Sequence, residues 1–335
     1  MCYDTVMKQK LPASVSLADV LAARQVIQPH IWHTPLLSSP ALSGQSGNQV
    51  FLKLECWQRT GSFKVRGALN KLAALTPEER SQGIVTASAG NHGLGVVYAS
   101  QMLGLPAATI FVPENASATK VNRLRTFDCR VHPAGTDYDT AHAIAEAYSR
   151  DHRAIYISAY DDPVVIAGQG TVGLEVMDDL PDADLLLVPV GGGGLIAGIA
   201  AVAKAVRPGV RIVGVQPDAS PSAYLSLRDG HAHESYPAGP TICDGLAGGF
   251  GRVPFEVAAE LIDEVLIVPE VDVRRAVGWL VAQEQLVVEG SGAIAVAPLL
   301  NGQLQARAQK VVAVLTGRNL DATLLRQILM EPTSQ

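Results

Sequence analysis

Thr60-Gly61-Ser62-Phe63-Lys64-Val65-Arg66-Gly67 is the stretch of this sequence from which the fold and the chemistry are interpreted. It follows a predicted strand over residues 50–54 and places one lysine between small, turn-forming residues and the start of an apolar helical pattern. A lysine at the start of a helix is usually solvated. The hypothesis that Lys64 is a covalent anchor therefore depends on what the rest of the chain places beside it.

Short β-rich runs alternate with helical patterns along most of the chain. The first series of runs covers residues 83–87, 107–112, 129–132 and 154–158, with helical patterns at about 93–103, 117–127 and 138–150. The second series covers residues 184–190, 211–215, 265–268 and 310–315. Alternation of this kind predicts parallel strands joined by crossover helices. We expect an α/β fold with two doubly wound parallel-sheet domains: a small domain over residues 82–158, and a large one from residues 1–81 and 159–335.

Composition supports two lobes and excludes several classes of protein. A length of 335 residues exceeds what one hydrophobic core usually holds, and 48% apolar with 17% charged residues suits sheets covered on both faces. The net charge of −6 without a basic run argues against nucleic acid as a partner, and no apolar stretch reaches membrane-spanning length. The four cysteines lack the spacing of a zinc site and are expected to be reduced thiols: Cys2, Cys56, Cys129 and Cys243. Without a signal peptide, we expect a cytoplasmic protein.

Four consecutive glycines, Gly191, Gly192, Gly193 and Gly194, lie between an apolar strand and a helical run over residues 196–206. Such a turn lets backbone N–H groups converge on an anion, and the helix N-terminus adds partial positive charge. A tight turn alone would need only one or two glycines. The pattern therefore predicts a phosphate cradle. It also matches a degenerate dinucleotide fingerprint, but the next strand ends in Gln216 rather than an acid, so hydride transfer stays the lesser alternative.

Two further polar loops follow predicted strands. Ser88-Ala89-Gly90-Asn91-His92-Gly93 offers backbone N–H groups to a substrate carboxylate and the Asn91 side-chain donor to a cofactor oxygen. In a purely structural interpretation, Ser88 or Asn91 caps the following helix. Thr316-Gly317-Arg318-Asn319 lies at the carboxyl end of the last strand, where open α/β sheets bind ligands. The hydroxyl of Thr316 could hydrogen-bond a ring nitrogen of such a ligand.

A lysine able to bond a carbonyl, a phosphate cradle and a loop for a substrate carboxylate together indicate a pyridoxal-phosphate enzyme. From His33-Thr34-Pro35-Leu36 to Asn319, the chain resembles the fold type II (tryptophan synthase β-like) enzymes, and among them the serine/threonine dehydratase and serine racemase group. The resemblance implies pyridoxal 5'-phosphate in a cleft between the two domains, a small-molecule amino-acid substrate and a homodimer. The lysine of the S-F-K-x-R-G motif, which carries the cofactor, corresponds to Lys64.

The resemblance also implies roles for other residues. Those expected to bind the cofactor are Phe63, Lys64, Asn91, Gly191, Gly192, Gly193, Gly194, Leu195 and Thr316. Phe63 would lie against the cofactor, Asn91 at its ring hydroxyl, the glycines at its phosphate and Thr316 at its pyridine nitrogen. Those expected to bind the substrate are Ser88, Ala89, Gly90, Asn91 and His92. Residues 241–245 and 289–293 resemble further landmarks of the family.

Departures from the family pattern narrow the prediction. Racemases of the group resemble S-S-G-N-H, in which the second serine hydroxyl works on the face opposite the lysine, whereas Ala89 has no hydroxyl. Gln216 and Ser222 replace the acidic ligands of the metal-binding members, so no metal is expected. Arg318 stands where dehydratases more often have glycine. The short stretch after Asn319 leads us to expect no C-terminal regulatory domain.

The predicted activity is β-elimination, in which Lys64 removes the α-proton of a β-hydroxy amino acid and the products are a 2-oxo acid and ammonia. L-Threonine and L-serine are the default substrates by resemblance, with 3-hydroxyaspartate or phenylserine as alternatives. Serine racemisation and β-replacement, as in cysteine synthase-like relatives, are the competing reactions. A binding protein that kept the fold but lost turnover is the non-enzymatic alternative.

Overall fold

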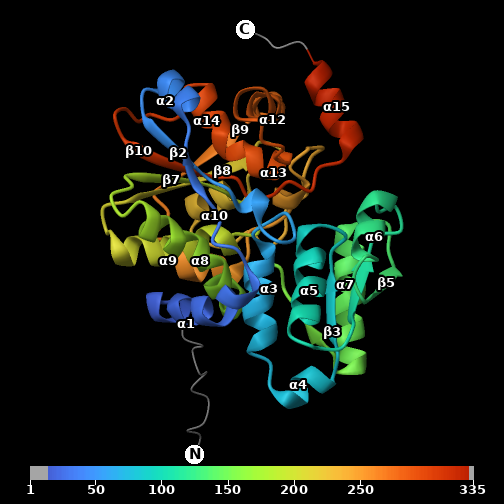
Figure 1. Ribbon diagram of the computed structural model, residues 1–335. Coiled ribbons are helices and arrows are strands. Elements are labelled where there is room, and N and C mark those ends of the chain that lie inside the picture. Colours follow the sequence, from blue (N-terminus) through green and yellow to red (C-terminus); the bar gives the residue numbers. More distant parts are fainter. Residues whose placement is uncertain (1–13, 332–335) are drawn as a thin grey trace, which may run out of the picture.

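The structure, a computed structural model, describes residues 14–331 and consists of two α/β lobes lying side by side (Figure 1). Cys2 lies outside the described residues. So does nearly all of the N-terminal segment from which a cytoplasmic location was predicted. Among residues 14–331, no helix is both long and apolar enough to cross a bilayer.

The larger sheet has six strands in the order β1-β2-β10-β7-β8-β9. Their bounds are β1 Leu36–Ser38, β2 Gln49–Lys53, β7 Leu185–Pro189, β8 Arg211–Pro217, β9 Glu264–Val268 and β10 Lys310–Val314. All neighbours pair in parallel except β1, which runs antiparallel to β2 at the edge. The predicted parallel strands are confirmed, whereas β1 was not predicted.

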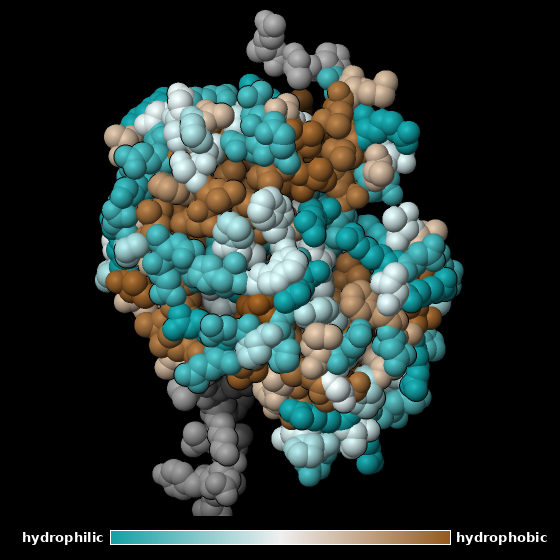
Figure 2. Space-filling view, in the orientation of Figure 1, coloured by the Kyte–Doolittle hydropathy of each residue, from teal (hydrophilic) through white to brown (hydrophobic). Residues whose placement is uncertain are grey.

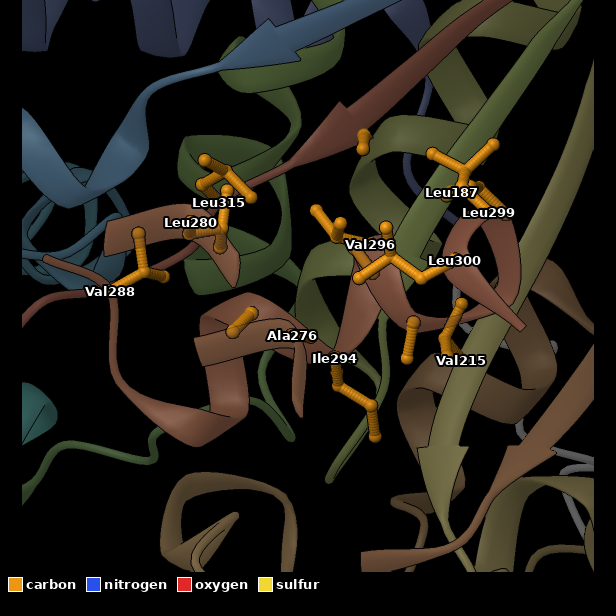
Figure 3. Close-up of a cluster of buried hydrophobic side chains, with 14 of the residues drawn as sticks. Leu187, Val215, Ala276, Leu280, Val288, Ile294, Val296, Leu299, Leu300 and Leu315 are labelled. Atoms are coloured by element: carbon orange, nitrogen blue, oxygen red, sulfur yellow. The ribbon is translucent and has the colours of Figure 1, made fainter. Parts of the chain in front are cut away.

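Alternate residues of these strands enter two separate cores. Leu185 and Leu187 of β7 pack in the core drawn in Figure 3, together with helix α12 (Glu270–Glu284). Leu186 and Val188 pack in the opposite core, against helices α8 (Pro163–Asp179) and α9 (Gly194–Val206). Because successive side chains of a strand point to opposite faces, a sheet covered on both sides needs an unbroken apolar strand. This explains why β7 reads as a continuous run of leucine and valine.

The smaller sheet has four parallel strands in the order β5-β4-β3-β6. Their bounds are β3 Ile84–Ala87, β4 Ala108–Val112, β5 Cys129–Pro133 and β6 Ile155–Tyr156. Both sheets therefore have the expected parallel α/β organisation. The predicted run over residues 154–158 forms only the two-residue strand β6.

The helices cover the sheets and connect their strands (Figure 1). In chain order they are α1 Leu17–Ile27, α2 Pro40–Ser46, α3 Lys64–Ala73, α4 Pro77–Ser81, α5 Asn91–Met102, α6 Ala118–Leu124, α7 Tyr138–His152, α8 Pro163–Asp179, α9 Gly194–Val206, α10 Ser222–Asp229, α11 Arg252–Ala258, α12 Glu270–Glu284, α13 Gly290–Ala293, α14 Ala297–Leu300 and α15 Ala322–Met330. Short 3₁₀ turns are η1 Gln28–His30, η2 Glu55–Trp57, η3 Asp244–Leu246 and η4 Ile294–Val296.

Helix α3, which begins at Lys64, lies between the two lobes and packs on helices from each (Figure 1). A Cβ on Gly168 of α8 would lie 2.6 Å from the carbonyl oxygen of Arg66. A Cβ on Gly95 of α5 would lie 3.1 Å from the carbonyl carbon of Lys64. Glycine at these two crossings lets α8 and α5 approach α3 closely, so both lobes position the first turn of α3.

Candidate active site

The loops that follow β2 and β10 lie side by side at the carboxyl edge of the larger sheet, because β2 and β10 are parallel neighbours. The backbone N–H of Phe63 donates to the carbonyl of Thr316 at 3.1 Å, and that of Arg318 donates to Gly61 at 2.9 Å. An isolated bridge between Ser62 and Gly317 joins the same two loops. The structure thus brings Lys64 and Thr316, which are far apart in the sequence, into one site.

Lys64 is half-buried, and its amine donates to the carbonyl of Ala159 at 3.1 Å. The nitrogen lies 5.1 Å from the ring centroid of Phe63. Desolvation lowers the pKa of Lys64 to about 8, while the nearby carboxyl group of Glu289 acts in the opposite direction. A lowered pKa increases the fraction of free amine near neutral pH, and only the free amine can attack a carbonyl carbon.

A buried ion network anchors α3 just beyond Lys64. The guanidinium of Arg66 is fully buried, and each of its five N–H groups has an acceptor. Paired bonds of 2.7–2.9 Å reach the carboxylates of Glu55 and Glu175, and the fifth donor reaches the hydroxyl of Thr171. Lys53 pairs with Glu175 at 2.6 Å. Because rigid, bidentate pairs fix orientation, this network ties α3 to η2, β2 and α8.

The glycine loop has the properties of an anion cradle. Within the described chain, the backbone N–H groups of Gly191, Gly192 and Gly193 donate no hydrogen bond, and α9 begins directly afterwards at Gly194. Gly193 has φ +94°, which favours glycine, and a Cβ on Gly192 would lie 2.4 Å from the ring of Tyr160. Free N–H groups at a helix N-terminus suit a phosphate group.

Gln169 of α8 connects this loop to the lysine. Its side-chain amide nitrogen donates to the carbonyl of Ala159 at 3.1 Å, the same carbonyl that accepts from Lys64. Its oxygen, which has no partner among the described residues, would lie 2.6 Å from a Cβ on Gly194. The carbonyl of Ala159 therefore links the Lys64 amine to Gln169, whose side chain lies beside the glycine loop. Leu195, predicted to close the loop, is buried in the first turn of α9.

The loop at residues 88–92 leaves open space beside Gly90. Gly90 has no atom within 4 Å of an added Cβ. Gly90 is also the N-cap of α5, with no side-chain capping bond, so the capping role considered for Ser88 or Asn91 is wrong. Instead, the Ser88 hydroxyl accepts from the N–H of Gly90 at 3.2 Å. Burial lowers the pKa of His92 to about 3, so its imidazole is neutral, and one ring nitrogen contacts the carbonyl of Ile157 at 3.0 Å.

Asn91 is held by two residues to which the sequence assigned no role. Its amide nitrogen donates to Glu289 at 2.6 Å, and its oxygen accepts from the amide of Asn319 at 2.5 Å. Glu289 is 6% exposed, and desolvation raises its pKa to about 7. The only sequence signal for Glu289 is a single acid before a glycine-rich turn, so its proximity to Asn91 was not predictable.

The other predicted residues lie at or near the edge of this site. Thr316 is buried, and its hydroxyl donates to the carbonyl of Ser291 at 3.2 Å. Arg318 is exposed, and the salt bridges of residues 14–331 do not include it. Gln216 of β8 adjoins the start of the glycine loop, since its side-chain nitrogen donates to the carbonyl of Val190 at 3.2 Å, and its side-chain oxygen accepts from the backbone N–H groups of Ala223 and Tyr224 in the first turn of α10.

The residues present fit pyridoxal phosphate. The cofactor has a phosphate, a carbonyl carbon, a phenolic oxygen and a ring nitrogen. The chain supplies free N–H groups at Gly191–Gly193, an amine of lowered pKa at Lys64, and polar side chains at Asn91 and Thr316. Buried polar atoms without partners among the described residues also lie in the segments around this site, including Ser62 Oγ, His92 Nδ1 and Gln169 Oε1.

Comparison with known proteins agrees with this fit. Residues 27–317 match the family model described as pyridoxal-phosphate dependent enzyme. The chain is 40% identical to an L-threonine ammonia-lyase of Thermotoga maritima, covering 94% of this chain and 78% of that protein. It is 39% identical to the catabolic L-threonine dehydratase of Escherichia coli, covering 94% and 96%. The solved structure of maize serine racemase superposes with a TM-score of 0.89 at 32% identity, covering 94% and 96%.

Proposed function

Because this chain belongs to the family of pyridoxal-phosphate dependent enzymes, we propose that it is a lyase that converts L-threonine, L-serine or both to a 2-oxo acid and ammonia. The observation that carries the proposal is the half-buried amine of Lys64, whose pKa is lowered to about 8, next to a glycine loop with free N–H groups. The similarity to threonine ammonia-lyases and dehydratases supports the substrate class.

When bound, pyridoxal phosphate withdraws electrons from the substrate Cα, so that its proton becomes acidic. Lys64 then serves as the base for that proton, since its lowered pKa leaves free amine at neutral pH. Backbone N–H groups of Gly191–Gly193 hold the phosphate, and the open space beside Gly90 takes the substrate carboxylate. The Asn91 amide would donate an N–H to the phenolic oxygen of the cofactor, and the Thr316 hydroxyl would have to turn from the carbonyl of Ser291, to which it donates at 3.2 Å, in order to donate to the ring nitrogen.

Elimination is favoured over racemisation because the loop at residues 88–92 lacks a proton donor at Ala89. Racemisation requires a second acid on the face opposite the lysine, and an alanine methyl group cannot supply one. The imidazole of the adjacent His92 is neutral at physiological pH and directed toward the carbonyl of Ile157. We therefore expect ammonia and a 2-oxo acid, with little D-serine formed from L-serine.

The test is ammonia release from L-threonine, L-serine, 3-hydroxyaspartate and phenylserine, together with the absorption spectrum of the purified protein. Lys64→Ala should abolish ammonia release and the yellow colour of the bound cofactor. Lys71→Ala, in the same helix and paired with Asp162 at 2.6 Å, is the matched control and should retain both. Turnover by Lys64→Ala would refute the assignment of the base, and substantial D-serine would favour the racemase.

We also propose a cytoplasmic homodimer. Figure 2 shows hydrophobic side chains gathered in a band over the lobe that holds the larger sheet. At the end of α15 in this lobe, the side chains of Leu329 and Met330 are 48% and 80% exposed, and a second copy of the chain would cover them. A monomer in analytical ultracentrifugation would refute the homodimer.

The cytoplasmic location is supported by the described cysteines, Cys56, Cys129 and Cys243, which are free thiols, as is typical of a reducing compartment.

A further inference from the structure

Glu289 is a buried carboxyl group to which the proposed reaction gives no role. It lies at the start of α13, is 6% exposed, and its oxygen would lie 2.2 Å from a Cβ on Gly317. The glycine thus leaves room for the carboxyl group beside the Thr316 loop. Burying a carboxylate is costly unless a specific interaction offsets the lost hydration, so its partner is informative. Its side-chain partner is Asn91, at 2.6 Å, and the backbone of Asn319 also hydrogen-bonds to it.

The orientation of the Asn91 amide, that is, which side carries its oxygen and which its nitrogen, is fixed by two hydrogen-bond acceptors. They are the carbonyl of Thr60, which acts through the amide of Asn319, and the carboxyl group of Glu289. Asn319 donates to the backbone carbonyl of Thr60 at 3.0 Å and to the oxygen of Asn91 at 2.5 Å. Because a carbonyl only accepts, Asn319 must direct its nitrogen there, and Asn91 must direct its oxygen to Asn319. Glu289 requires the same orientation, since its ionised carboxylate also only accepts. One N–H of Asn91 then remains for a ligand.

We propose that Glu289 is a positioning residue, which holds the Asn91 amide so that an N–H group, never the carbonyl oxygen, is presented to the phenolic oxygen of pyridoxal phosphate. This inference rests on the cofactor-binding part of the proposed function. Without Glu289, the amide has one remaining anchor, Asn319, and the donor is no longer fixed before the cofactor arrives. Cofactor affinity, rather than turnover alone, is the quantity that this role affects.

The charges around Glu289 set the pH at which this arrangement changes. Asp244 raises the pKa of Glu289, whereas Lys120 lowers it, and these two residues pair with each other at 2.5 Å. The charge of Glu289 also acts on three neighbouring groups and raises their pKa values: the amine of Lys64 and the thiols of Cys56 and Cys243. Since burial is the main cause, the pKa lies near 7, and acidification below it converts Glu289 to a weaker acceptor.

The experiment is a double-mutant cycle on cofactor affinity. The dissociation constant of pyridoxal 5'-phosphate is measured by protein fluorescence for wild type, Asn91→Ala, Glu289→Leu and the double variant. Each single variant should bind about tenfold more weakly, and the double variant no more weakly than Asn91→Ala. Glu284→Leu, which removes a carboxyl that accepts from Ser39 instead, is the matched control and should bind like wild type.

Additive losses, or Glu289→Leu affinity within twofold of wild type while Asn91→Ala is weakened, would overturn this inference and leave the proposed function intact. A wild-type protein that binds no cofactor would overturn both. If Glu289→Leu does not fold, Glu289→Gln supplies the test. It should reduce the loss of affinity on acidification through about pH 7 to the part that protonation of the Lys64 amine causes, and Asp244→Asn should move the Glu289 part of that loss to lower pH. An unchanged pH profile in Glu289→Gln would also overturn the inference.

Discussion

Replacing Arg66 with methionine tests whether the buried ion network holds α3 in place. The substitution keeps most of the side-chain volume, but of the buried cations that pair with Glu55 and Glu175 in residues 14–331 it leaves only Lys53, which pairs with Glu175. Removing one partner of a buried ion pair typically costs about 3 to 5 kcal/mol, because the remaining charge stays buried and uncompensated. We expect a loss in this range, since two bidentate pairs break at once.

The assay is urea unfolding at pH 7 and pH 5, followed by circular dichroism. The control is Arg24→Met, which removes an exposed ion pair with Asp178 and should cost no more than about 1 kcal/mol. Burial by itself raises the pKa of Glu175, and Arg66 and Lys53 lower it, so without Arg66 the buried carboxyl group can take up a proton between pH 7 and pH 5 and is then no longer an uncompensated charge. The deficit of Arg66→Met should therefore be smaller at pH 5 than at pH 7.

Two results would refute this reasoning about Arg66. One is a loss below about 1 kcal/mol at pH 7, which would mean that the methionine side chain compensates for the network. The other is a deficit that does not change with pH, which would assign the loss to packing rather than to uncompensated carboxylates.

Three other substitutions test separate parts of the site. As pH rises from 5 to 8, Glu289→Gln should become about 2 to 3 kcal/mol more stable relative to the wild-type apoprotein. The reason is that the raised pKa of Glu289, about 7, makes its ionisation costly in the folded protein, whereas a glutamine does not ionise. The same pH dependence of urea unfolding in the variant and in wild type would contradict this. Gly192→Ala should weaken cofactor binding at least tenfold in fluorescence titration, since its Cβ would lie 2.4 Å from the ring of Tyr160, whereas Gly44→Ala, with open space around it, should not. Arg318→Gly should reduce kcat/KM for 3-hydroxyaspartate more than for threonine if the exposed guanidinium meets a distal carboxylate, and an equal change for both substrates in an ammonia assay would exclude that role.

Local patterns were sufficient to predict most of the secondary structure. Strand β7 was predictable because both of its faces are buried, which requires an unbroken apolar run that no loop would carry. Strand β1 was missed because its three residues have no such pattern. It exists because Leu36, Leu37 and Ser38 pair with the edge of β2. Edge pairing depends on the neighbouring strand, so a sequence of this length does not reveal it.

The sequence by itself determined the chemistry that each loop can offer: a lysine at a helix start, consecutive glycines with free N–H groups, and an asparagine beside small residues. Only the tertiary structure decided how these groups act on one another. Glu289 and Asn91 are 198 residues apart and hydrogen-bond at 2.6 Å, and the lowered pKa of Lys64 comes from the burial that packing of the two lobes imposes. Hydrogen bonds and desolvation depend on distances in space, which the order of residues along the chain does not contain.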